Sequence, residues 1–264
     1  MFLLLGLIGL MWGINQVGKA GVNWDLVGTL LAVSLLALAW FVVRQLKLAT
    51  PLLELRVLKT FNYDLAVLLT SISYIALIVT TIIFPLYYQG VLGVSPFVSG
   101  MSLVPGAVFL SLLNPLSGKL ADRIGFKPTM LVGMAMIIIG WGAGILVVSQ
   151  HSLMGMLLCA MVIEGGNAFV MMPAVTLGAN ALPDRLVAHG TAVITTIRQV
   201  LGSAGVVVAT MVLANVTNRV GQSGVSHSAA SLTGFRAVFS LMVLVELVGL
   251  FLALLLKYTK KKPD

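Results

Sequence analysis

The chain alternates long apolar segments with short polar ones. Eight apolar runs are each long enough, at about 20 residues, to cross a bilayer as a helix. They occupy residues 1–17, 26–44, 62–84, 96–116, 129–149, 153–178, 191–214 and 236–257. Charged residues, glycine or proline separate each run from the next, as is usual at helix ends. The pattern predicts an all-α membrane protein with about eight transmembrane helices.

Composition strengthens this interpretation. The chain is 59% hydrophobic and only 9% charged, whereas about a quarter of the residues in a soluble domain are charged. Sixteen Lys and Arg against eight Asp and Glu give a net charge of +8. These basic residues sit at the ends of apolar runs, so they indicate orientation in a membrane. We therefore expect lipids and no nucleic acid among the partners.

The distribution of basic residues predicts the orientation. If the eight spans alternate, the side that holds the polar stretch Gly118–Lys127 receives most of the Lys and Arg residues. That side carries Arg44, Lys47, Arg56, Lys59, Lys119, Arg123, Lys127, Arg185, Lys257, Lys260, Lys261 and Lys262. The opposite side carries only Lys19, Arg219 and Arg236. Because basic loops stay in the cytoplasm, we expect a multi-pass protein of the cytoplasmic membrane with both termini inside the cell.

The spacing of the spans divides the chain into three parts. Residues 1–50 hold two accessory transmembrane helices, residues 51–61 form a cytoplasmic linker, and residues 62–264 form a six-helix bundle. Apolar residues in the linker are expected to lie along the membrane interface as a short amphipathic helix. The stretch Asn218–Gly234, rich in Gly and Ser, is expected to be the longest outer loop and to be mobile.

One polar stretch between two spans is the most informative local pattern. It is expected to form a tight, charged hairpin loop with the sequence Gly118-Lys119-Leu120-Ala121-Asp122-Arg123-Ile124-Gly125-Phe126-Lys127. Gly118 and Gly125 would allow a sharp turn and a close approach of helices. Asp122 would cap the next helix or pair with a basic neighbour. Arg123 and Lys127 would hold the loop at the anionic inner leaflet.

This stretch resembles the cytoplasmic signature of the major facilitator superfamily, roughly Gly-x-Leu-Ala-Asp-Arg-x-Gly followed by basic residues. Phe126 departs from the pattern, since the family usually has a basic residue there. Other stretches resemble the fourteen-helix drug:proton antiporter branch of that superfamily. They are Pro51-Leu52-Leu53-Glu54-Leu55, Pro85-Leu86-Tyr87-Tyr88-Gln89, Gly93, Ser99-Gly100, Pro105-Gly106, and Arg198-Gln199 before Gly202 and Gly205.

The resemblance implies a function. It suggests two linker helices followed by the C-terminal six-helix half of a proton-coupled multidrug efflux transporter. Such a transporter exchanges hydrophobic, often cationic compounds for protons, so no cofactor is expected beyond the proton as coupling ion. It would also need an N-terminal six-helix half as partner, because facilitators rock one half against the other. Two alternatives stay open: a transporter of another solute, and a truncated membrane module that does not transport.

Two carboxyl groups lie inside predicted spans. Glu164 is near the middle of span 153–178, where an acidic side chain costs about 2.5 kcal/mol or more on insertion scales. Asn167, three residues later, shares that helix face. Glu164 is either a proton carrier or cation ligand, with Asn167 lining the site, or a protonated residue that holds helices together. Glu246 has the same cost and is a further candidate for proton coupling or substrate binding, although the resemblance places the last helix at the periphery, which favours a lipid-facing or inter-half role.

Arg198 is the one basic residue away from the ends of a predicted span. It either modulates a carboxyl group or forms an inner gate, or else its side chain snorkels to the inner surface. The nearby Gly202–Gly205 stretch is expected to be a helix-packing surface.

The sequence has no metal-ligand spacing, phosphate-binding loop or nucleophile elbow, so we do not expect an enzyme. The single cysteine, Cys159, is expected to pack as a small apolar residue.

Overall fold

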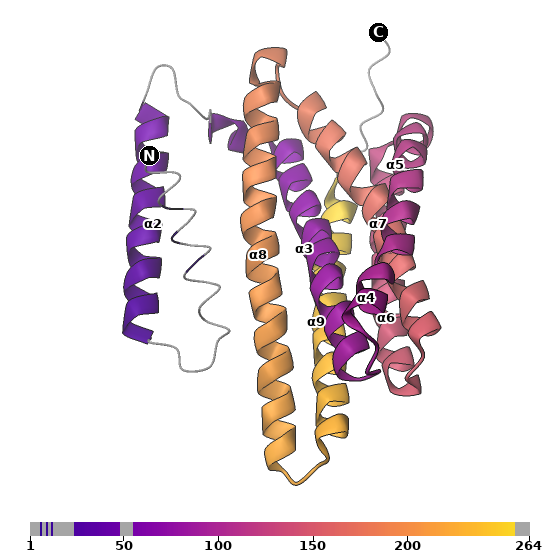
Figure 1. Ribbon diagram of the computed structural model, residues 1–264. Helices are drawn as coiled ribbons and strands as arrows, with labels where there is room; N and C mark the ends of the chain where they lie inside the picture. Colours follow the sequence, from indigo (N-terminus) through magenta and orange to yellow (C-terminus); the bar gives the residue numbers. More distant parts are fainter. Residues whose placement is uncertain (1–5, 7–8, 10–11, 13–23, 48–54, 257–264) are drawn as a thin grey trace.

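A computed structural model describes residues 24–47 and 55–256, together with Gly6, Gly9 and Trp12. Every regular element in this part of the chain is a helix (Figure 1). The elements are α2 (Trp24–Lys47), the 3-10 helix η1 (Leu55–Lys59), α3 (Phe61–Gly90), α4 (Pro96–Met101), α5 (Val104–Ile124), α6 (Phe126–Val147), the 3-10 helix η2 (Val148–Gln150), α7 (Leu153–Asn180), α8 (Asp184–Gln222) and α9 (His227–Leu255).

Six helical stretches in the described residues are long and apolar enough to cross a membrane. They correspond to the last six predicted spans, with α4 and α5 together forming one of them. The all-α membrane fold is therefore confirmed. Helix α2 contains the predicted span 26–44, whereas the predicted span 1–17 lies almost entirely outside the described residues.

Helix α3 runs through the middle of the bundle and packs against α7, α8 and α9. Helix α6 packs against α7 and α9, and α5 packs mainly against α7. In Figure 1, α2 stands beyond α8 at the edge of the molecule, and it contacts η1. Because α3 contacts both α7 and α8, residues of these three helices lie close together.

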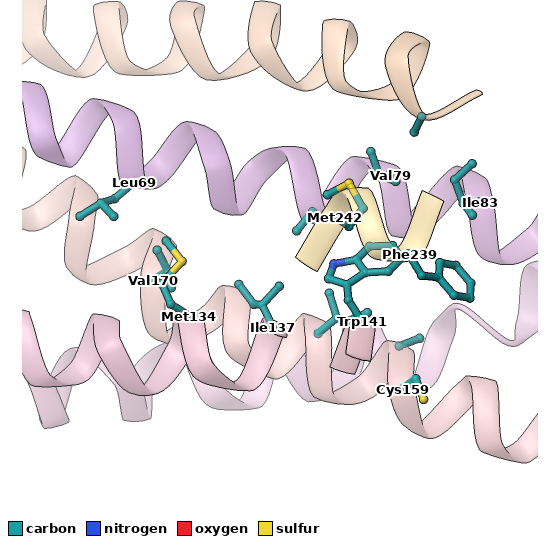
Figure 2. Packing of buried hydrophobic residues seen from close by; sticks show 14 of the residues in the cluster. Leu69, Val79, Ile83, Met134, Ile137, Trp141, Cys159, Val170, Phe239 and Met242 are labelled. Atoms are coloured by element: carbon teal, nitrogen blue, oxygen red, sulfur yellow. The ribbon is translucent and has the colours of Figure 1, made fainter. Parts of the chain in front are cut away.

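An aromatic cluster joins three helices in the core. The rings of Phe84 (α3), Trp141 (α6) and Phe239 (α9) have centroids 5.4 to 5.8 Å apart. Figure 2 shows Trp141 beside Phe239, with Met242 and Ile137 packed around them. Such pairs add about 0.5 to 1.5 kcal/mol beyond the area that they bury. Cys159 is buried and free in the same core, as expected.

Glycines let α6 and α7 approach closely. A Cβ atom added to Gly133 of α6 would lie 2.7 Å from the carbonyl oxygen of Gly166 on α7. One added to Gly140 would lie 2.6 Å from Ile163 of α7. Small residues at this spacing allow the backbones of two helices to touch. Close van der Waals packing of this kind stabilises helix pairs in a membrane, where the hydrophobic effect does not drive helices together. The seam fixes α7, the helix that carries Glu164.

The connections are shorter than the sequence pattern suggests. The expected mobile loop Asn218–Gly234 is wrong, because α8 continues to Gln222 and α9 begins at His227. Only four residues, 223–226, join the two helices. Helix α8 has 39 residues and is about 58 Å long at 1.5 Å per residue. It exceeds the hydrocarbon thickness of about 30 Å, so its polar ends remain helical beyond the apolar core of the bilayer.

The linker docks on the bundle through one side chain. Val57 of η1 is only 1% exposed and packs in a small cluster with Tyr63 of α3 and Ile194 of α8. Leu58 remains exposed. Part of the apolar surface expected to face the membrane interface therefore packs against protein, and residues 51–54 of the linker lie outside the described residues.

We predict that Gly133→Ala destabilises the bundle by about 1 to 3 kcal/mol, because its methyl group would overpack the α6–α7 seam. Gly142→Ala is the matched control on α6, since a Cβ atom there meets nothing within 4 Å. Thermal unfolding in detergent should show a lower melting temperature for Gly133→Ala alone. Equal melting temperatures for the two variants would contradict the seam.

Candidate functional site

The polar stretch between α5 and α6 is mostly helical. Helix α5 continues to Ile124 and α6 begins at Phe126, so the predicted hairpin loop from Gly118 to Lys127 is wrong in its length. The turn is made by Gly125, whose φ of 95° and ψ of 161° favour glycine. Gly118 faces open space, since a Cβ atom there would meet nothing within 4 Å. The expected close approach of a helix at Gly118 is thus absent within the described residues.

The charged side chains of this stretch have different surroundings. Asp122 and Arg123 are exposed and Leu120 is partly buried. Helix α6 has no side-chain cap, so Asp122 does not cap it. The Nζ atom of Lys127 donates a 2.6 Å hydrogen bond to the carbonyl of Leu254 in the last turn of α9. A cation there offsets the partial negative charge of the helix C-terminus and ties α6 to α9.

Glu164 lies at the contact between α7 and α5. A Cβ atom added to Gly106 of α5 would lie 3.1 Å from Cγ of Glu164. The next residue, Gly165, contacts the ring of Phe109 on α5 in the same way. Glu164 is 7% exposed. Because residue 106 is a glycine, α5 leaves room for the side chain of Glu164. Glu164 itself remains slightly exposed.

Asn167 turns to another helix. Its Oδ1 accepts a hydrogen bond from the hydroxyl of Ser73 on α3, and its Nδ2 donates to the carbonyl of Ile163 at 3.1 Å. Asn167 and Ser73 are fully buried. The prediction that Asn167 and Glu164 share one binding surface is therefore only partly met, because Asn167 joins α7 to α3 while Glu164 faces α5. Asn167 acts mainly as a link between helices.

Glu246 lies inside the bundle on α9. Its side chain is 0% exposed, and neither carboxyl oxygen has a hydrogen-bond partner among the described residues. Gly249, one turn later, lies against Ile72 of α3 and Met134 of α6. The expectation that Glu246 faces lipid is therefore wrong. An ionised carboxylate in such surroundings is very unfavourable, so this group is stable as a neutral acid.

Arg198 lies over an aromatic ring. Its Cζ atom is 5.2 Å from the centroid of Tyr74 on α3. The hydroxyl of Tyr74 donates a 2.7 Å hydrogen bond to Oε1 of Gln199. A Cβ atom at Gly202 would collide with the Tyr74 ring, so this glycine makes room for it. The gating and snorkelling interpretations of Arg198 both stay predictions. Tyr74 could not be recognised from the sequence, because no local pattern shows that it meets Arg198.

The sequence likewise offers no sign of a cavity between the C-terminal parts of α3 and α8 and the N-terminal part of α9. It has a volume of about 420 Å³ and includes Leu86, Thr210, His227 and Phe235 in its lining. None of its lining residues is one of the carboxyl groups discussed above. Its residues come from the consecutive helices α8 and α9 and from α3, which is far from them in the sequence, so no local pattern could have indicated it.

Ionisable groups held inside an all-helical membrane bundle are typical of secondary transporters. The family model of the Major Facilitator Superfamily matches residues 1–206, and the chain belongs to this superfamily. The resemblance based on the stretch Gly118–Lys127 is thereby confirmed.

Known relatives agree with this assignment. The chain is 37% identical over 259 residues to the uncharacterized MFS-type transporter YcnB of Bacillus subtilis, covering 98% of this chain and 54% of the relative. It is 30% identical over 261 residues to the lincomycin resistance protein LmrB of Listeria monocytogenes, covering 97% and 55%. It is 24% identical over 196 residues to the multidrug resistance protein Stp of Mycobacterium tuberculosis, covering 73% and 36%. The chain spans about half the length of the first two relatives.

We predict that Ser73→Ala lowers the free energy of unfolding by about 0.5 to 2 kcal/mol, because it leaves Oδ1 of Asn167 buried without its donor. Ser71→Ala is the matched control, since the buried hydroxyl of Ser71 donates only to Val67 on its own helix. Thermal unfolding of both variants in the same detergent would measure the difference. A loss for Ser71→Ala as large as that for Ser73→Ala would count against the interhelical bond.

Proposed function

We propose that this chain is the C-terminal part of a secondary transporter that exports hydrophobic, often cationic compounds in exchange for protons. Membership of the superfamily supports transport. Relatives named as lincomycin and multidrug resistance proteins support drug efflux as the class of transport. Because the chain spans about half of LmrB and YcnB, the proposal concerns the complete transporter that contains it.

The observation that carries the proposal is the placement of Glu164. A carboxyl group inside a membrane bundle is a functional candidate by default, because it is costly to keep there. Glu164 lies beside a glycine of α5 and keeps 7% exposure, whereas Glu246 is completely enclosed. Proton exchange and cargo binding both need access, so Glu164 is the better coupling group. Protonation of Glu164 and binding of a cationic compound would then compete, and inward proton flow would drive export.

The exposed faces of the bundle support a need for a partner. Helix α8 and the α4–α5 span bury the smallest shares of their apolar windows among the six candidate spans. On α5, Val108, Leu112 and Leu116 are all at least half exposed. We propose that the N-terminal half of the complete transporter covers part of these faces and that lipid covers the rest. Alternating access then arises from rocking of the two halves.

We predict that Glu164→Gln in the complete transporter lowers proton-driven dye uptake into inside-out vesicles, which corresponds to export from the cell, by about tenfold or more, since the exchangeable proton is lost. Glu246→Gln is the comparison, because it replaces the enclosed carboxyl group with an amide of similar shape and should leave transport and proton coupling largely unchanged. Undiminished uptake with unchanged proton coupling in Glu164→Gln would refute the assignment.

We further propose that the Gly125 turn lies in the cytoplasm and residues 223–226 lie outside. In a Cys159→Ala background, Ser223→Cys should react with a membrane-impermeant maleimide on intact cells. Lys119→Cys, exposed near the inner end of α5, should react only after permeabilisation. Labelling of both positions from the same face of intact cells would overturn this orientation.

A further inference from the structure

The group formed by Arg198, Gln199 and Tyr74 lies inside two candidate membrane spans, about a third of the way along α8 and somewhat less than halfway along α3. Arg198 is 14 residues beyond the start of α8 at Asp184, which is about 21 Å along the helix at 1.5 Å per residue. Tyr74 is 13 residues beyond the start of α3 at Phe61, or about 20 Å. A cationic side chain at this depth needs compensation from protein or water.

The surroundings of Arg198 provide little compensation. Its Nε atom is buried and has no hydrogen-bond partner among the described residues. No carboxylate in that part of the chain comes within 4 Å of its nitrogens. The Tyr74 ring at 5.2 Å gives a cation–π contact. The Tyr74 ring attracts the positive charge of the guanidinium group. It does not accept conventional hydrogen bonds from the five N–H donors of that group.

Gln199 adds a second unused donor on the same helix. Its Oε1 already accepts the hydrogen bond from Tyr74, so its amide NH₂ group remains free to donate. Gln199 is exposed on α8, whose apolar window is the least buried of the six candidate spans. Two neighbouring side chains thus present N–H donors within a candidate membrane span, on a helix with a largely exposed apolar face.

We infer that Arg198 and Gln199, positioned by Tyr74, form a binding site for a carboxylate inside the membrane. A carboxylate has two acceptor oxygens, which match the fork of a guanidinium, and its charge balances the cation. The carboxylate comes either from an acidic side chain in the remainder of the complete transporter or from transported cargo. Only this question of source rests on the proposed function; the binding site is a property of the chain itself.

The test measures binding of a carboxylate probe to the full 264-residue chain in zwitterionic lipid nanodiscs. The probe is 1-pyrenebutyrate, and its uncharged amide, 1-pyrenebutyramide, is the matched control ligand. We expect the carboxylate to bind about ten- to a hundredfold more tightly than the amide, as for hydrogen bonds to charged groups. Equal affinities for the two ligands would overturn the inference, and no proton gradient or transport is needed to obtain the result.

Substitutions of Arg198 test whether this residue causes the preference for the carboxylate over the amide. Arg198→Gln should abolish it, and Arg198→Lys should reduce it, because lysine keeps the charge but lacks the planar fork. Arg219→Gln, on the exposed outer part of α8, is the matched control and should retain the full preference. Circular dichroism and thermal unfolding would verify that each variant is folded. A full carboxylate preference in folded Arg198→Gln would overturn the site.

A second measurement distinguishes the two sources. Binding of 1-pyrenebutyrate is repeated on the complete transporter. If an acidic side chain of the other half fills the site, the probe no longer binds there. If cargo supplies the carboxylate, the probe still binds and is transported in an Arg198-dependent manner. Binding without transport supports the carboxylate site and shows that this probe is not cargo. The proposed function fails or stands by the Glu164→Gln dye-transport measurement instead, so the two failures remain distinguishable.

Discussion

A peptide group inside a bilayer has no water to bond with, so each N–H and C=O must find a partner within the protein. All regular structure in residues 24–47 and 55–256 is accordingly helical. The same constraint acts on side chains. Many hydroxyls bond to a carbonyl one turn earlier in their own helix, as Thr70, Ser71 and Thr80 do on α3. These bonds make polar residues tolerable without fixing any helix to another.

Interhelical contacts therefore depend on a smaller set of residues. Glycines such as Gly133 and Gly166 bring α6 and α7 into backbone contact, and the hydrogen bond from Ser73 to Asn167 joins α3 to α7. Glu164, Glu246 and Arg198 are different, because the structure records no hydrogen bond from their charged groups to another described side chain. Ionisable groups inside a membrane that lack such a structural partner are candidates for a functional role.

The sequence predicts the six bundle helices well, because the length of an apolar run is a direct consequence of bilayer thickness. It predicts their ends poorly. Asn218 and Arg219 are polar, yet α8 continues through them, since a helix outside the hydrocarbon needs no apolar side chains. The turn at Gly125 could be predicted from its glycine, but Gly118 faces open space. The meeting of Tyr74 with Arg198 could not be predicted, because it joins residues 124 positions apart.

The contrast between the two carboxyl groups follows from which helices enclose them. Glu246 is on α9, which packs against α3, α6 and α8, so its carboxyl oxygens reach only the interior. Glu164 is on α7 at the edge of its contact with α5, where Gly106 contributes no side chain. Glu246 is 0% exposed in the packed bundle, whereas Glu164 is 7% exposed. Two residues of equal insertion cost thus differ in enclosure because different helices surround them, and this difference makes Glu164 the better candidate for exchanging protons in the proposed transport.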